Sequence, residues 1–409
     1  MTSYRNSDPR PPIMAGSPPS LIVPRMDWDR PPWNRWAFQH VREFLPTAEV
    51  WRGRGRVRAL KPGALRKLAR KERDLDGLDV AGANGVRTTL ARLLDDTYAD
   101  GFLVIKRGVI AYERYFNGMG ERTLHLSQSV AKSVTGGVFG ALLAKKLIDP
   151  AALITEYLPE LDDTAYRGAL VQHILDMTSG VHFDETYTNP YSDVGQSDVA
   201  SGWKPAPPDS APDFRWPKHM FEQILGLGNL DRRHGESFAY RSIETDVLGF
   251  CLERAGGARL AELISREIWQ KIGAEESACL SLDPAGYGLA SGGFNATLRD
   301  YGRFGLLYLE NGGGILPTEW VEATRNGNHA IFGEPYTQSL PEGAYKNQWW
   351  IEDAKSRSIM ARGVFGQLIY VNWDHEMVVV KLSSWPDFIN TNFNIVTLKA
   401  IHRIAEALS

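Results

Sequence analysis

The order of secondary-structure patterns along the chain is the feature that most restricts its fold. Strand-like patterns occupy 102–106, 109–115, 367–373 and 377–382. Arg107-Gly108 separates the first two and suits a tight hairpin. A helical stretch covers 129–147, helices and long loops continue to about residue 340, and an amphipathic helix covers 390–408. This order predicts one sheet built from both chain ends, with a helical part inserted between them.

The predicted fold class is α+β, with an antiparallel sheet flanked by helices and an inserted, mostly helical domain. Residues 1–50 are expected to form a proline-rich N-terminal arm, because the first 33 residues hold eight of the 23 prolines. The sheet domain is predicted to comprise 51–150 and 285–409, and the helical domain 151–284. A site is then expected in the cleft between these two parts.

Composition excludes several other classes of protein. With 43% hydrophobic and 23% charged residues, the 409-residue chain is neither disordered nor a coiled coil. The net charge of -3 favours no partnership with nucleic acid. Ten Lys/Arg within 52–73 leave nucleic-acid binding as a minor alternative to a solvated basic face with a helix. No membrane span and no secretory leader is visible, and the two cysteines fit a cytoplasmic setting.

Two S-x-x-K patterns carry the first indication of chemistry. Ser201 to Lys204 runs into prolines, whereas Ser129 to Lys132 opens a helical run. At this spacing an amine lies beside a hydroxyl on one helix face. Serine needs a base to become a nucleophile, and lysine serves as one only when its pKa is lowered. The alternative is an N-cap serine with a solvated lysine nearby.

Three further stretches of sequence favour a catalytic serine–lysine pair over an N-cap serine with a solvated lysine. They are Ile174 to Gly180, Gly235 to Ser242 and Ala290 to Asp300. Together with Ser129-x-x-Lys132 they resemble, in order and spacing, the penicillin-recognising serine hydrolases, which include class C β-lactamases and D-alanyl-D-alanine peptidases. The likeness covers roughly 98–405. Within this family the chain most resembles the 6-aminohexanoate-dimer hydrolases, a subgroup that also cleaves carboxylic esters. This likeness is carried by the stretches 34–38, 43–47, 347–350 and 380–386.

The resemblance implies catalytic roles for four residues. Ser129 matches the acylated nucleophile, Lys132 its base, and Tyr240 the tyrosine that passes a proton to the leaving group. Taken alone, Tyr240 would be read as a core aromatic. The family's K-T-G or H-x-G element aligns with 361–363, and the N–H groups of Ser129 and Val364 would form the oxyanion hole.

The resemblance also implies substrate-binding residues. They are Tyr187, Asp198, Trp203, Ser291 and Trp350. Tyr187 would bond the leaving nitrogen, Asp198 would face a substrate ammonium, and Trp350 would close over the substrate. Taken alone, Asp198 is a solvated loop acid. Ser291 and Phe365 stand where the subgroup has asparagine and histidine, which predicts a less polar pocket and a more apolar acyl group.

The resulting expectation is a serine hydrolase of carboxylic esters or linear amides of the 6-aminohexanoate type, acting through an acyl-enzyme. A D-amino-acid peptidase or β-lactamase is the alternative, and Ser242 and Ala361 argue against it because the usual amide and carboxylate grips are missing. A non-catalytic sensor that keeps the fold is the second alternative. The resemblance implies no metal and no cofactor. Dimers are common among the resembling enzymes, but these residues show no interface, so a homodimer stays open.

Overall fold

A seven-stranded antiparallel sheet forms the centre of the protein. The computed structural model describes residues 23–60, 75–83 and 85–409. The strands, in order across the sheet, are Val109–Tyr115 (β5), Ala99–Lys106 (β4), Met377–Ser383 (β13), Gln367–Asn372 (β12), Ser358–Gly363 (β11), Trp349–Ile351 (β10) and Ala344–Lys346 (β9). Strand β4 from the first half of the chain pairs with the C-terminal β13, so the prediction of one sheet built from both chain ends is confirmed.

The predicted hairpin between β4 and β5 is present. Its two turn residues, Arg107 and Gly108, have φ of 50° and 75°. Two successive residues in the left-handed region match the twist of a two-residue hairpin, and glycine adopts that region without a steric penalty.

The two faces of the sheet bury alternate residues of each strand. Val378 pairs with Ile105 on one side and with Val371 on the other, and all three belong to the core that contains helix α11 (Leu298–Leu309). Val104 and Val379 point to the opposite face, under helix α13 (Thr391–Ala407). Because successive strand residues point to opposite faces, these apolar runs are typical of a sheet covered by helices on both sides.

A four-stranded antiparallel sheet lies beside the main sheet and was not predicted. Its strands, in order, are Thr47–Val50 (β1), Ala278–Ser281 (β7), Phe294–Ala296 (β8) and His125–Leu126 (β6). Each is too short to give a periodic signal in the sequence. Strand β6 ends three residues before Ser129, so this sheet fixes the approach to the candidate nucleophile. Asp79–Ala81 (β2) and Arg87–Thr89 (β3) form a separate two-stranded sheet.

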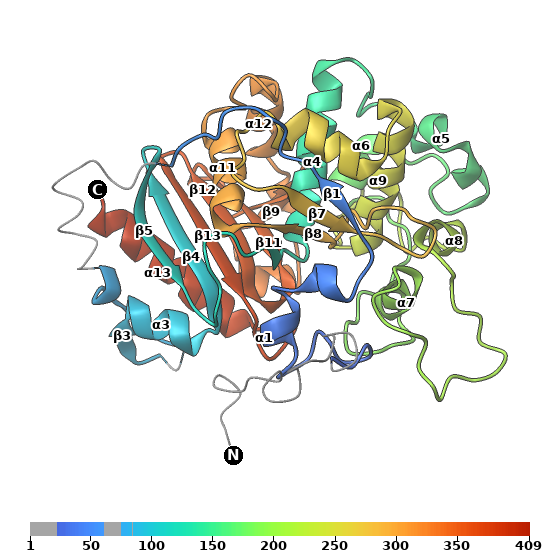
Figure 1. Cartoon of the computed structure of the whole chain (residues 1–409). Helices are drawn as coiled ribbons and strands as arrows, with labels where there is room; N and C mark the ends of the chain where they lie inside the picture. Colours follow the sequence, from blue (N-terminus) through green and yellow to red (C-terminus); the bar gives the residue numbers. More distant parts are fainter. Residues whose placement is uncertain (1–22, 61–74, 84) are drawn as a thin grey trace.

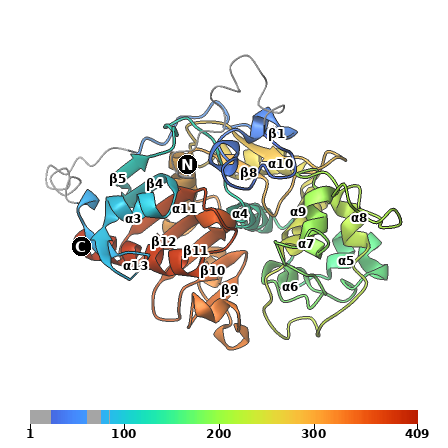
Figure 2. The ribbon, with the colours of Figure 1, turned by 90° about the horizontal axis from the view of Figure 1, so that it is seen from below.

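Helices α5 to α9 lie together on one side of the molecule (Figures 1 and 2). Figure 2 shows α5 to α9 on one side of α4 and the seven-stranded sheet on the other. Besides α11 and α13, the described residues form the α-helices Asn34–Ala37 (α1), Leu90–Asp96 (α3), Val130–Ala144 (α4), Ile154–Tyr157 (α5), Val171–Leu175 (α6), Asp193–Ala200 (α7), Met220–Leu225 (α8), Ser242–Gly256 (α9), Leu260–Ile264 (α10) and Thr318–Thr324 (α12). Ser265–Trp269 continues α10 as a π-helical turn, and 3-10 turns occupy Val41–Glu43, Pro159–Asp163, His329–Ile331, Tyr336–Gln338 and Val364–Gly366. The proposed domain bounds at 150 and 284 stay predictions.

The described part of the N-terminal arm packs onto the body of the protein. Trp28 is fully buried, and its Nε1 donates a hydrogen bond of 3.0 Å to the carbonyl of Trp203. Residues 1–22 and residues 61–74, which include the second part of the basic run, lie outside the described residues, so the predictions made for them stay open. Within the described part of that run, Arg58 forms an ion pair with Glu310.

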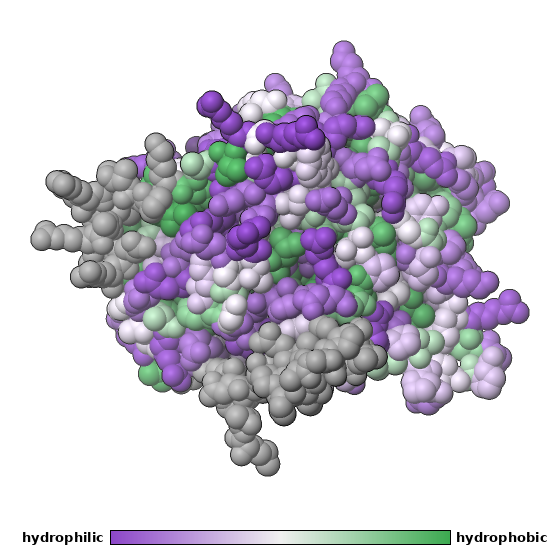
Figure 3. Space-filling view, in the orientation of Figure 1, coloured by the Kyte–Doolittle hydropathy of each residue, from purple (hydrophilic) through white to green (hydrophobic). Residues whose placement is uncertain are grey.

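The described residues offer neither a membrane-spanning helix nor a metal-binding cluster. No helix in the described ranges is long and apolar enough to cross a bilayer. The face shown in Figure 3 is mainly hydrophilic, with small, scattered hydrophobic areas. Likewise, residues 23–60, 75–83 and 85–409 contain no cluster of three histidine, cysteine or acidic side chains suited to a metal ion.

Candidate active site

Ser129 lies at the N-terminus of helix α4, at the junction between the two sheets. It is the N-cap residue, and the preceding Gln128 has a φ of 48°, in the left-handed region. The side chain of Ser129 is 8% exposed, at the surface of a cleft. An N-cap position leaves helix N–H groups without intrahelical partners, and these favour negative charge. The helix end therefore suits a serine whose adduct with a carbonyl group carries an oxyanion.

Lys132 is one helical turn further on and contacts Ser129 directly. Its Nζ donates hydrogen bonds to Ser129 Oγ at 2.9 Å, to Ser242 Oγ at 3.2 Å and to the carbonyl of Ser291 at 2.7 Å. Three acceptors match the three N–H donors of a lysine ammonium. The amine is thus held at one position, with the serine hydroxyl as one of its three partners.

Burial lowers the pKa of Lys132 to about 8, although the negative charges of Glu185 and Asp246 act in the opposite direction. Desolvation disfavours the charged form of an amine, and the side chain is only 2% exposed. The neutral amine that can accept the serine proton is therefore populated near neutral pH. This excludes the alternative of a solvated lysine.

Tyr240 approaches the same pair from the loop before helix α9. The Lys132 Nζ lies 5.2 Å from the centroid of the Tyr240 ring. Burial raises the pKa of the Tyr240 phenol, and a side-chain hydrogen bond with Ser129 acts in the opposite direction. The ring stacks on Trp350 at 5.2 Å, which fixes its plane. A protonated phenol beside the serine is placed to relay a proton.

The end of strand β11 lies close against the turn that precedes Ser129. A Cβ on Gly363 would lie 2.6 Å from the carbonyl oxygen of Ser127 and 3.1 Å from Cβ of Gln128. Only glycine allows this approach between β11 and the turn that leads into α4. Ser129 and Val364 consequently line the same cleft.

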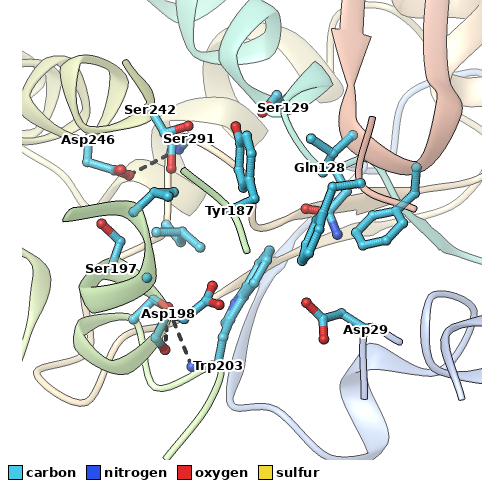
Figure 4. A pocket seen from close by; sticks show the side chains of 18 residues that line it. Asp29, Gln128, Ser129, Tyr187, Ser197, Asp198, Trp203, Ser242, Asp246 and Ser291 are labelled. Carbon is cyan, nitrogen blue, oxygen red and sulfur yellow. Dashed lines mark hydrogen bonds between the residues drawn. The ribbon is translucent and has the colours of Figure 1, made fainter. Parts of the chain in front are cut away.

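The predicted substrate-binding residues lie around this cleft in two groups. Tyr187, Asp198, Trp203 and Ser291 line a pocket with Ser129 (Figure 4). Trp350 lines an adjoining pocket that also contains Ser129, Tyr187 and Tyr240. In Figure 4, Asp198 and Trp203 lie at the end of the first pocket away from Ser129, with Tyr187 between. The structure thus brings all five predicted residues to the cleft.

Asp198 has a partner that the sequence did not reveal. Lys204 Nζ lies 3.0 Å from an oxygen of Asp198 and 2.7 Å from one of Asp29. Asp29 lines the same pocket and comes from the N-terminal arm. Two carboxylates thus share one ammonium. A substrate ammonium that binds Asp198, as predicted, would compete with Lys204 for that carboxylate or bind beside it.

Glu185, Ser242 and Asp246 are site residues that the sequence did not single out for catalysis. Glu185 accepts hydrogen bonds from the Tyr187 hydroxyl at 2.7 Å and from both the amide (2.9 Å) and the hydroxyl of Ser242. Asp246 accepts the Ser291 amide at 3.0 Å, and burial raises the pKa of its carboxyl to about 6. Ser242 ends one of the stretches that carry the resemblance, but no local motif marks Glu185 or Asp246, because their charges act on Lys132 only through the tertiary fold.

Comparison with known proteins identifies the class to which this fold and site belong. The beta-lactamase family matches residues 86–394. This is well over half of the chain, so the protein belongs to that family. It is a serine hydrolase, and the fold class predicted from the sequence is confirmed.

Within this family, the chain is similar to 6-aminohexanoate-dimer hydrolases over most of its length. The chain is 35% identical over 371 residues, 89% of each chain, to the 6-aminohexanoate-dimer hydrolase of Paenarthrobacter ureafaciens. It matches the structure of a Bacillus anthracis protein, provisionally called a 6-aminohexanoate-dimer hydrolase, with a TM-score of 0.83, 30% identity, and 95% and 98% of the two chains covered. A class C beta-lactamase matches with a TM-score of 0.58 and 13% identity, covering 83% of this chain and 98% of that one, which shows the shared fold alone.

Proposed function

We propose that the protein hydrolyses carboxylic esters and linear amides through an acyl-enzyme on Ser129. The observation that carries this proposal is the buried contact of 2.9 Å between Lys132 Nζ and Ser129 Oγ, with the pKa of Lys132 lowered to about 8. A base of this kind is what a serine nucleophile requires.

The proposed reaction has two halves. Neutral Lys132 takes the proton from Ser129 as Oγ attacks the carbonyl carbon, and the oxyanion accepts hydrogen bonds from the N–H groups of Ser129 and Val364. Such donors typically contribute about 3–4 kcal/mol each in the transition state. Tyr240 passes the proton to the leaving oxygen or nitrogen, whose bond to the carbonyl carbon breaks. Water then attacks the acyl carbonyl carbon, the bond from that carbon to Ser129 Oγ breaks, the carboxylic acid is released, and Lys132 returns a proton to Oγ.

The substrate class is supported by the relatives and by the pocket. The Paenarthrobacter relative is named for cleavage of a linear amide, the 6-aminohexanoate dimer. Phe365 and Trp203 line the pocket that contains Ser129 and give it apolar walls. We therefore expect small carboxylic esters as the best substrates and linear amides second. A cytoplasmic location and a homodimer stay predictions.

The test is hydrolysis of p-nitrophenyl butyrate by the wild type, Ser129→Ala and Lys132→Met, with intact-mass detection of an acyl adduct. We expect turnover in the wild type, a loss of about a thousandfold or more in each variant, and a butyryl mass increase that Ser129→Ala does not show. A 6-aminohexanoate dimer assay then measures the amidase activity.

Two further measurements test the alternatives. Nitrocefin turnover tests for a β-lactamase, and ligand binding tests for a non-catalytic sensor. Nitrocefin turnover that exceeds ester turnover would favour a β-lactamase. A folded wild type with no turnover and no adduct, whose ligand binding survives Ser129→Ala, would favour a sensor and contradict the proposal.

A further inference from the structure

Arg362 occupies a position in the cleft to which the proposed reaction assigns no role. It is the penultimate residue of strand β11, directly before Gly363, and pairs with Leu368 of β12. Its side chain lines the pocket that contains Ser129, Tyr240 and Trp350. A cation is therefore built into the wall of the cleft beside the nucleophile.

The guanidinium of Arg362 has no acidic partner among the described residues. It lies over the Trp350 ring, 5.2 Å from the centroid, and its Nη1 donates a hydrogen bond of 3.3 Å to Ser339 Oγ. Burial lowers the pKa of this guanidinium to about 10. By contrast, Arg299 and Arg303 pair with carboxylates. A partly desolvated charge that lacks a counter-ion is costly, and an anionic ligand offsets that cost.

The acid in the same pocket is already engaged. Glu185 lines it, but one of its oxygens accepts from Tyr187 and Ser242 hydroxyls and the other from the Ser242 amide. The remaining fork of N–H donors on Arg362 matches the two oxygens of a carboxylate. One guanidinium without a second cation among the lining residues suits a singly charged anion.

The position of Tyr240 indicates which half of the substrate meets Arg362. In the proposed reaction Tyr240 delivers the proton to the leaving group, and the charge of Arg362 acts on the Tyr240 phenol. Both residues lie in the Trp350 pocket, whereas Asp198 and Trp203 line the other. The leaving group is therefore expected to lie on the Arg362 side.

We propose that Arg362 binds a carboxylate on the leaving group of the substrate. This rests on the proposed function and specifies its substrate class: esters and amides whose alcohol or amine half carries a carboxylate. In the 6-aminohexanoate dimer that half is 6-aminohexanoate, which carries one.

The test compares two esters that differ in one group, 4-carboxyphenyl butyrate and its neutral isostere 4-carbamoylphenyl butyrate. The measured quantity is the ratio of their kcat/KM values in the wild type, Arg362→Met, Arg362→Lys and the control Arg357→Met. Arg357 precedes β11 and is exposed. We expect the ratio to fall about tenfold or more in Arg362→Met, to be partly restored in Arg362→Lys, and to stay at the wild-type value in the control.

Two outcomes would overturn the proposal. An unchanged ratio in Arg362→Met means that no carboxylate is bound there. A parallel loss for both esters with a shifted pH profile means that Arg362 acts through Tyr240 instead. If Arg362→Met does not fold, the smaller change to Arg362→Lys and competitive inhibition of the wild type by 4-hydroxybenzoate against 4-hydroxybenzamide answer the question.

If the protein is not a hydrolase at all, the experiment gives a different result from the two outcomes above. A wild type that cleaves neither ester contradicts the hydrolase proposal. Calorimetric binding of 4-hydroxybenzoate and 4-hydroxybenzamide to the wild type and Arg362→Met still tests the anion site. Equal binding of both compounds by the wild type would then reject it.

Discussion

Lys132 shows how burial gives a lysine the lowered pKa that the proposed base requires. A lysine in water has a pKa near 10.4, too high for it to accept a proton at neutral pH. Here desolvation lowers the pKa to about 8, while Glu185 and Asp246 limit the fall. Desolvation is the larger effect because the side chain is almost completely buried. The hydrogen bonds to Ser242 and Ser291 hold the amine in place, and the third hydrogen bond joins it to Ser129 Oγ.

This lowered pKa predicts the pH dependence of the reaction. Below the pKa Lys132 is protonated and cannot accept the Ser129 proton, and above it the neutral amine can. We therefore expect kcat/KM for p-nitrophenyl butyrate to rise with pH through a single limb near pH 8 and then to level off. The measurement is a pH–rate profile between pH 6 and 10, corrected for spontaneous hydrolysis.

Asp246→Asn provides a matched check on that profile. The asparagine oxygen can still accept the Ser291 amide, but the negative charge that raises the Lys132 pKa is gone. The rising limb should move to lower pH. A limb that stays in place, or moves to higher pH, would show that Asp246 does not act on the titrating group.

At the scale of elements, the site depends on how closely strand β11 meets the turn before helix α4. Gly363 ends the strand and faces the carbonyl of Ser127. Val364 follows Gly363 directly and Ser129 follows Ser127 by two residues, so this contact constrains the two amides that we propose as oxyanion donors. The geometry of the site is thus set by the packing of two elements more than 200 residues apart in the sequence.

Gly363→Ala should separate activity from folding. The added Cβ would lie 2.6 Å from a backbone oxygen, so strand and turn must move apart and the Val364 amide leaves its position. Loss of one oxyanion donor typically lowers kcat by about a hundredfold to a thousandfold. The measurement is kcat with p-nitrophenyl butyrate, with circular dichroism to confirm folding.

Gly228→Ala is the matched control, because a Cβ there meets nothing within 4 Å. It should leave kcat near the wild-type value. Full activity of a folded Gly363→Ala protein would contradict the oxyanion assignment.

At the scale of the whole molecule, the N-terminal arm ties the sheet part to the loop that carries the pocket. Trp28 is enclosed by Phe38, Phe44 and Trp203, with ring centroids 5.2 to 6.0 Å apart. Nearby, Asp29 reaches Lys204 of the same loop. The arm therefore supplies part of the pocket wall as well as apolar contacts.

Trp28→Ala should destabilise the protein strongly. Truncation of a fully buried tryptophan leaves a cavity and typically costs about 3–5 kcal/mol. We expect a lower urea midpoint of unfolding, whereas Trp51→Ala, at a side chain 45% exposed, should change stability by less than about 0.5 kcal/mol. Equal midpoints for the two variants would mean that the arm does not contribute to the stability of the body.

The sequence by itself determined four of the seven strands of the main sheet, the C-terminal helix that covers one of its faces, and the candidate chemistry. The strands around Val104 and Val379 were predictable because long apolar runs bounded by turn residues leave few alternatives. The pairing of Ser129 with Lys132 was predictable because a spacing of three residues on a helix is local geometry. The resemblance to a family added Tyr240 and Val364, which local geometry does not link to Ser129.

Only the tertiary structure decided the electrostatics and the recognition surfaces of the site. The lowered pKa of Lys132, the bond network of Glu185, and the contact of Asp198 with Lys204 depend on residues that meet through folding. The four-stranded sheet was likewise not predictable, because its strands are too short to give an alternating hydrophobic pattern in the sequence. Desolvation and charge pairing depend on distance in space, and a sequence fixes that distance only over a helical turn or a hairpin.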